Sequence, residues 1–110
     1  MTIKIQHFQP YNVYSHHAKY TVVSRLIYKE DEQFPSGFEF AVSFCSPKDQ
    51  FNKKSGRIIA YSRLQNKDKE YYRHFDLTAK HNPKYIDLRD LIVSTIFATM
   101  NIPRWLRDSY

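Results

Sequence analysis

The sequence predicts one α+β domain over residues 1–110, with a mainly antiparallel sheet of three to four strands and two helices packed on one face of it. The predicted order of elements is β-β-β-α-β-α. Two observations predict this class: short segments alternate apolar and polar residues with the period of a strand, and two longer segments combine helix-start residues with helical periodicity. A chain of 110 residues supports one real core and leaves little room for a second.

The first three strands are predicted in the N-terminal half. Residues 2–9 alternate weakly through Ile3 and Ile5, which indicates an edge strand, and residues 20–29 are rich in β-branched and aromatic side chains. The charged segment that follows contains Pro and Gly, and it predicts a long-loop hairpin leading into the next strand. We expect Arg25, inside the second strand, to face solvent.

The third strand has one large face and one small face. One side is therefore expected to be buried under large side chains, while the other leaves room for close packing by another element. The large residues are Phe38, Phe40, Val42 and Phe44, and they alternate with Glu39, Ala41, Ser43 and Cys45.

A helix is predicted from Pro47 to Gln65. Ser46 is the expected N-cap, and Asp49 suits the capping box. Gly56 lowers helix propensity by about 1 kcal/mol relative to Ala, which predicts a close approach there by another element or a ligand. The helical period gives a core side of Phe51, Ser55, Ile58, Ile59 and Ser62, and a basic side of Gln50, Lys53, Lys54, Arg57 and Tyr61.

The same helix carries the pattern D-x-F-x-K-K-x-G-R-x-I-A-x-x-R-L. This pattern resembles a helix that recurs in small, mostly uncharacterised proteins encoded by bacteriophages and prophages, although Ser62 stands where such proteins often carry Gly. The resemblance implies a phage origin and an intracellular role in infection, and it implies no catalytic residue. Its residues are Asp49, Phe51, Lys53, Lys54, Gly56, Arg57, Ile59, Ala60, Arg63 and Leu64.

A fourth strand is predicted over residues 70–77, where Tyr71, Arg73 and Phe75 alternate with polar residues. Aromatic side chains interleaved with Arg73 are typical of surfaces that bind single-stranded nucleic acid. Packing within the sheet explains the same aromatic residues, and both interpretations stay open.

The second helix is predicted from Leu88 to Asn101, with Asp87 as its cap and Asp90 in its first turn. Its main apolar face is Leu88, Leu91, Ile92, Thr95, Ile96 and Thr99. A second apolar strip of Val93, Phe97 and Met100 predicts either a homodimer or cover by the N-terminal segment. Pro103 ends the helix, and Trp105, between two arginines, is either an interface anchor or tucked against the core.

Composition limits the function classes. Seventeen Lys and Arg against eleven Asp and Glu give a net charge of +6, which favours contact with a polyanion. The one Cys excludes an internal disulfide, and no segment has the length of a signal peptide or membrane span, so we expect a cytoplasmic protein in the host cell. The five His residues show no ligand spacing, and we predict no metal and no cofactor.

No catalytic motif is present, and with two Gly residues the chain has no Gly-rich phosphate loop, so we predict a non-enzyme; a nuclease built from dispersed carboxylates stays open. Two hypotheses follow. In the first, a small phage accessory protein binds DNA or RNA through a basic helix surface. In the second, the protein is an anti-defence or host-takeover factor of a phage, which inhibits a host protein by binding it through its aromatic and apolar surface. The predicted nucleic-acid residues are Lys53, Lys54, Arg57, Arg63 and Arg73, and the predicted partner interface is Val93, Phe97, Met100 and Trp105.

Overall fold

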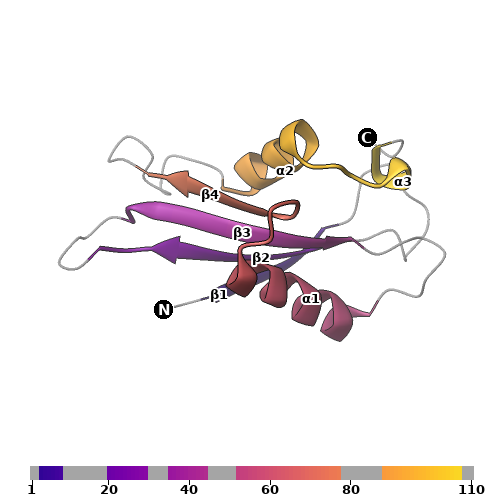
Figure 1. The fold of residues 1–110 in the computed structure, drawn as a ribbon, viewed down its shortest axis with the longest axis horizontal. Helices are drawn as coiled ribbons and strands as arrows, with labels where there is room; N and C mark the ends of the chain where they lie inside the picture. Colours follow the sequence, from indigo (N-terminus) through magenta and orange to yellow (C-terminus); the bar gives the residue numbers. More distant parts are fainter. Residues whose placement is uncertain (1–2, 9–19, 30–34, 45–51, 78–87, 108–110) are drawn as a thin grey trace.

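The computed structural model describes residues 3–8, 20–29, 35–44, 52–77 and 88–107, with only the backbone of residues 105 and 107, and every structural statement below concerns this part of the chain. Four strands and two longer helices follow in the predicted order β-β-β-α-β-α, and a short helix ends the series (Figure 1). The elements are β1 (Ile3–Phe8), β2 (Tyr20–Ile27), β3 (Gly37–Phe44), α1 (Lys53–Asn66), β4 (Tyr72–Asp76), α2 (Leu88–Thr99) and α3 (Arg104–Arg107).

The strands form one antiparallel sheet in the order β1-β2-β3-β4. The predicted α+β class, the four strands and the edge position of β1 are therefore confirmed. Val22 pairs with Val42 and Val23 pairs with Ala41, so even-numbered residues of β2 and β3 share one face of the sheet and odd-numbered residues share the other. The two faces differ in side-chain size as the alternation in β3 predicts.

The two long helices lie on opposite faces of this sheet (Figure 1). The large face forms the main core, in which Phe40 and Val42 pack with Ile92 and Ile96 of α2. The small face forms a second cluster with α1. The prediction that both helices pack on one face is wrong. α2 packs on the face with the large side chains, and α1 packs on the face with the small side chains, where a helix can approach closely. The second cluster consists of Val23, Ala41, Ala60 and Leu64.

α1 begins later than the sequence predicts. Asn52 is the N-cap, with extended backbone (φ −125°, ψ 111°), and its side chain accepts hydrogen bonds from the backbone N–H of Lys54 at 2.9 Å and of Ser55 at 3.1 Å. The extended Asn52 rules out a continuous helix from Pro47, so the predicted cap at Ser46 is wrong; residues 45–51 themselves lie outside the described part. The helix ends at Lys67, which adopts the left-handed conformation (φ 50°).

The predicted core side of α1 is also wrong. Ile58 is 57% exposed and Ile59 is 44% exposed, whereas Ala60 and Leu64 are fully buried. The small residues Gly56 and Ala60 lie on the sheet side of α1 because this part of the helix lies very close to the sheet. A Cβ atom at Gly56 would lie 2.6 Å from the Oγ1 atom of Thr21, which confirms the predicted close approach at this glycine.

α2 packs on the large face through Ile92, Thr95 and Ile96, all buried. Asp90 lies in its first turn as predicted, while Asp87 lies outside the described residues. Met100, which the sequence places on a second apolar strip, is buried in the main core of this chain. Leu106 of α3, which follows α2, belongs to the same core. No helix in the described ranges is long and apolar enough to cross a membrane.

Candidate functional site

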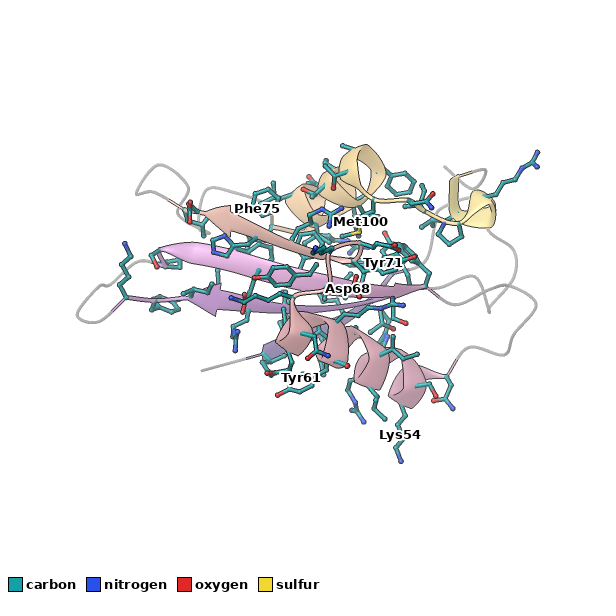
Figure 2. All side chains as sticks on the ribbon, viewed as in Figure 1. Lys54, Tyr61, Asp68, Tyr71, Phe75 and Met100 are labelled. Carbon is teal, nitrogen blue, oxygen red and sulfur yellow. The ribbon has the colours of Figure 1, made fainter. Side chains whose placement is uncertain are left out.

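Three of the predicted nucleic-acid residues gather on α1. Lys53, Lys54 and Arg57 are all exposed, and none of them forms an ion pair with another described residue. We call these three residues the α1 basic surface. Lys54 projects from the side of the helix that faces away from the sheet, as Tyr61 does further along (Figure 2). The predicted exposure of the basic side is therefore confirmed for these residues.

The local electrostatics of the α1 basic surface are one-sided. α1 carries four cationic residues and no acidic residue, and its first turn contains Lys53 and Lys54. The positive end of a helix dipole favours anions and disfavours cations, so these two lysines stand where they weaken the helix. The backbone N–H groups of Lys54 and Ser55 at this end already donate to the Asn52 side chain, so the lysine ammonium groups are the donors that face an incoming anion. The arrangement lowers helix stability and raises the positive potential at one end of α1.

Arg63 does not join the α1 basic surface. Its Nη1 atom donates a hydrogen bond to the backbone carbonyl oxygen of Val42 at 2.7 Å. Its guanidinium carbon lies 4.2 Å from the centre of the Tyr71 ring, a cation–π distance. These contacts hold the half-buried Arg63 side chain between α1 and the sheet, where it joins the helix to β3.

Arg73 lies on the opposite face of the sheet from α1. Its Nε atom donates to Thr99 Oγ1 at 3.0 Å and its Nη2 atom to the Thr99 carbonyl oxygen at 2.9 Å. Its Nη1 atom donates to the carbonyl oxygens of Tyr72 at 2.7 Å and Lys69 at 3.1 Å. Arg73 thus connects β4 to the end of α2, and it lies apart from the three cations of α1.

The predicted partner interface is not a single exposed strip. Val93 and Phe97 are half-buried, with Phe97 packed against the main core, and Met100 is part of that core. The backbone of Trp105 lies in α3, and its side chain is outside the described part. Self-association through Val93 and Phe97 stays a prediction.

An apolar groove lies between β1 and α1, and sequence reasoning missed it because it relied on the wrong helix phase. The groove has a volume of about 640 Å³. Ile5, Ile58 and Tyr61 line it and are 41%, 57% and 42% exposed. The described residues that line it are Ile3, Ile5, Arg57, Ile58, Tyr61, Ser62, Gln65 and Asn66. Exposed apolar side chains collected in one groove are typical of a binding surface.

A polar network crosses β2, β3 and β4 on the α1 face of the sheet. Glu39 is 2% exposed, and its Oε1 atom accepts hydrogen bonds from Arg25 Nε at 2.7 Å and from Arg25 Nη2. Its Oε2 atom accepts a hydrogen bond from the Tyr72 hydroxyl at 2.6 Å. The prediction that Arg25 faces solvent is wrong, because the hairpin register places Arg25 directly opposite Glu39. The pairing of opposite charges across a predicted hairpin is the sequence signal that would have found it.

The network holds Glu39 as a carboxylate. Burial raises the pKa of Glu39, but the hydrogen bonds from Tyr72 and Arg25 and the nearby Arg25 and His74 charges outweigh burial and lower it below its ordinary value of 4.5. Burial and the bond to Glu39 raise the pKa of Tyr72 to about 12. Both carboxylate oxygens are occupied by protein donors, so the network fixes three strands relative to one another.

No group of three or more His, Cys, Asp or Glu side chains within the described residues is arranged to hold a metal ion. The chain matches no protein-family model, no curated protein and no solved structure. The functional argument therefore depends on two surface features, the α1 basic surface and the groove beside it.

Proposed function

We propose that this protein binds nucleic acid through the α1 basic surface, as a small accessory protein of a phage that acts in the cytoplasm of the infected cell. The observation that carries the proposal is the set of three exposed cations, Lys53, Lys54 and Arg57, at the N-terminal half of a helix without acidic residues. The phage setting comes from the resemblance of residues 49–64 to phage-encoded proteins. The proposed action is binding, with no catalytic step.

The physical support is electrostatic. Nucleic acids carry dense negative charge, and each Lys or Arg that neutralises a phosphate releases a condensed counterion. The overall charge of +6 adds a long-range attraction for a polyanion. Lysines that destabilise the first turn of α1 in the free protein are stabilised when a phosphate binds there, because the helix dipole and the cations then act on the same anion.

The contact that this surface supports is with the nucleic-acid backbone. Phosphate contacts carry no sequence information, so we expect binding with little sequence preference. Tyr61 lies one helical turn beyond Arg57 and is 42% exposed. An exposed ring beside cations supports stacking on an unpaired base, so we expect single strands to bind more tightly than duplex DNA.

The test compares the wild type with the Lys53→Glu/Lys54→Glu/Arg57→Glu variant in gel-shift titrations against duplex DNA, single-stranded DNA and RNA. The matched control changes Lys4, Lys29 and Lys69 to Glu, because these exposed lysines lie away from the α1 basic surface and give the same change in net charge. We expect the α1 variant to bind at least tenfold more weakly than the control on every nucleic acid. Equal losses in the two folded variants would refute the α1 assignment.

A second candidate function is favoured by the groove between β1 and α1. In this alternative the protein is a phage inhibitor that binds a host protein, and the exposed Ile5, Ile58 and Tyr61 form the contact. Apolar side chains desolvated at the centre of an interface contribute most of the affinity in such complexes. If the wild type binds none of the three nucleic acids in the gel-shift titrations, this second candidate becomes the better one.

A further inference from the structure

The outer edge of β1 has no neighbouring strand among the described residues. β1 is the first strand in the sheet order β1-β2-β3-β4, and β2 is its partner on one side. An edge strand presents unpaired backbone N–H and C=O groups on its other side, and these groups are a template for another extended chain. Lys4, Ile5 and His7 of β1 are exposed.

The apolar groove runs beside this same edge. α1 packs mainly over β2 and β3; Ile3 of β1 packs against the small-face cluster under the helix, whereas Ile5 is 41% exposed. These two side chains share the α1 face of the sheet, and Ile58 and Tyr61 of the helix line the same groove. A chain paired with β1 would place every second side chain on this face, next to the groove.

The positive charge beside the groove lies at one end of it. Gly56 of α1 approaches Thr21, and Thr21 pairs with His7, so the N-terminal half of α1 lies toward the His7 end of β1. Leu64 lies in the small-face cluster against which Ile3 packs, which places the other half of α1 toward the start of β1. Among the described residues that line the groove, Arg57 alone is charged, so their positive charge lies toward the His7 end of β1.

We propose that an extended segment of a partner protein adds to β1 as a fifth strand, with alternate apolar side chains in the groove and an acidic side chain at the Arg57 end. Strand addition satisfies the open backbone groups, and the groove supplies side-chain specificity. Charge selects an acidic partner over a second copy, because each copy carries +6 and the described residues of the groove lining include no acidic one. The inference goes beyond nucleic-acid binding, and it rests on the second candidate function, in which the same groove contacts a partner protein, to which it adds the β1 edge and an acidic extended segment.

The probe is a displayed library of random twelve-residue peptides, selected on the immobilised full chain. The expected consensus alternates apolar residues with period two and carries Asp or Glu at one end. The best peptide is then synthesised in two further forms, each methylated at every second backbone nitrogen. Strand addition requires one of the two forms to lose at least tenfold in affinity, because that form lacks the N–H donors that pair with β1.

Matched variants locate the peptide. Ile58→Ser and Ile5→Ser should each weaken the selected peptide by about tenfold, while Ile59→Ser should leave its affinity unchanged, because Ile59 is similarly exposed on α1 but does not line the groove. Arg57→Glu should weaken the acidic peptide by about tenfold and restore binding to the same peptide with Lys at its acidic position. Circular dichroism and urea unfolding confirm that each variant is folded.

Several results would overturn the inference. These are selection of no peptide, a consensus without alternation, equal effects of Ile58→Ser and Ile59→Ser, or no loss in either methylated peptide. Concentration-dependent self-association abolished by Ile5→Ser would instead identify a second copy as the occupant and overturn the acidic partner. Ile5→Ser, Ile58→Ser and Ile59→Ser leave the net charge unchanged, and their affinity for a single-stranded oligonucleotide should equal that of the wild type. The two assays therefore test nucleic-acid binding and strand addition independently.

Discussion

Replacing Gly56 by Ala tests how closely α1 lies against the sheet. Alanine raises helix propensity by about 1 kcal/mol, so an exposed site would gain stability. At this site the new Cβ atom would lie 2.6 Å from Thr21 Oγ1 and 3.3 Å from Thr21 Cβ. Thr21 is fully buried, and its Oγ1 atom is 2.9 Å from His7 Nδ1, within a hydrogen bond. The added methyl group therefore requires the helix or Thr21 to move.

The steric cost is larger than the propensity gain. Overpacking a well-filled site costs roughly 1–3 kcal/mol, and moving the Thr21 hydroxyl away from His7 forfeits a hydrogen bond of about 1 kcal/mol. After the gain in propensity is subtracted, Gly56→Ala should lower the free energy of unfolding by about 1–3 kcal/mol. Ser55→Ala is the control, because residue 55 is exposed on the same helix and meets no such contact.

The decisive assay is urea unfolding of a double-mutant cycle. Thr21→Ala removes both the hydroxyl and the methyl group that face residue 56. In that background the 3.3 Å approach to the Cβ atom of residue 21 remains, but the 2.6 Å approach to the hydroxyl is gone, so Gly56→Ala should cost at least about 1 kcal/mol less than in the wild type. A Gly56→Ala variant that is more stable than the wild type, or a cycle without coupling between the two sites, would refute the close approach of α1.

Three further predictions concern the cap and the polar network. Asn52→Ala should lower the free energy of unfolding by about 1 kcal/mol in urea, because the helix loses its N-cap acceptor, and an unchanged value would place the helix start elsewhere. The pKa of Glu39 is lower in the folded state, so its contribution to the free energy of unfolding is present above pH 4.5 and is lost as pH falls through the lower folded pKa. Glu39→Gln should lower the free energy of unfolding by roughly 3 kcal/mol at neutral pH and make it depend less on pH in acid. An acid dependence unchanged from that of the wild type in chemical denaturation would contradict the network. The pKa of Tyr72 is raised in the folded state, so its contribution to the free energy of unfolding is present below pH 10.0 and is lost as pH rises toward about 12. Tyr72→Phe should remove this loss of stability at high pH. A spectroscopic titration can follow the formation of tyrosinate in the wild type and in the variant.

Strand β3 was predictable because its alternation of large and small residues is unambiguous. Phe38, Phe40 and Val42 face the main core, and the small residues opposite them correctly predict close packing by another element. The phase of α1 was not predictable from hydrophobicity, since Ile58 and Ile59 outweigh Gly56 and Ala60 on any scale of apolar character. At Gly56 and Ala60 the helix lies so close to the sheet that only small residues fit between them. The buried side of α1 can therefore be predicted only from the size of the side chains that face it on the sheet.

The candidate site was predictable in part for a similar reason. Lys53, Lys54 and Arg57 lie on an exposed helix face, and their charge alone predicts a surface. Arg63 and Arg73 have the same charge, but their partners are backbone carbonyl groups of residues distant in sequence, such as Val42 and Thr99. Sequence patterns do not reveal such contacts, because a carbonyl group is present at every position.

The salt dependence of nucleic-acid binding tests the proposed function most directly. The slope of the logarithm of the association constant against the logarithm of salt concentration counts the phosphates that the protein neutralises, at about 0.9 per contact on B-DNA. The Lys53→Glu/Lys54→Glu/Arg57→Glu variant should show a slope shallower than that of the wild type by about 2 to 3, while the Lys4→Glu/Lys29→Glu/Lys69→Glu control should keep a slope close to that of the wild type. A folded α1 variant with the wild-type slope would contradict the assignment of phosphate contacts to α1.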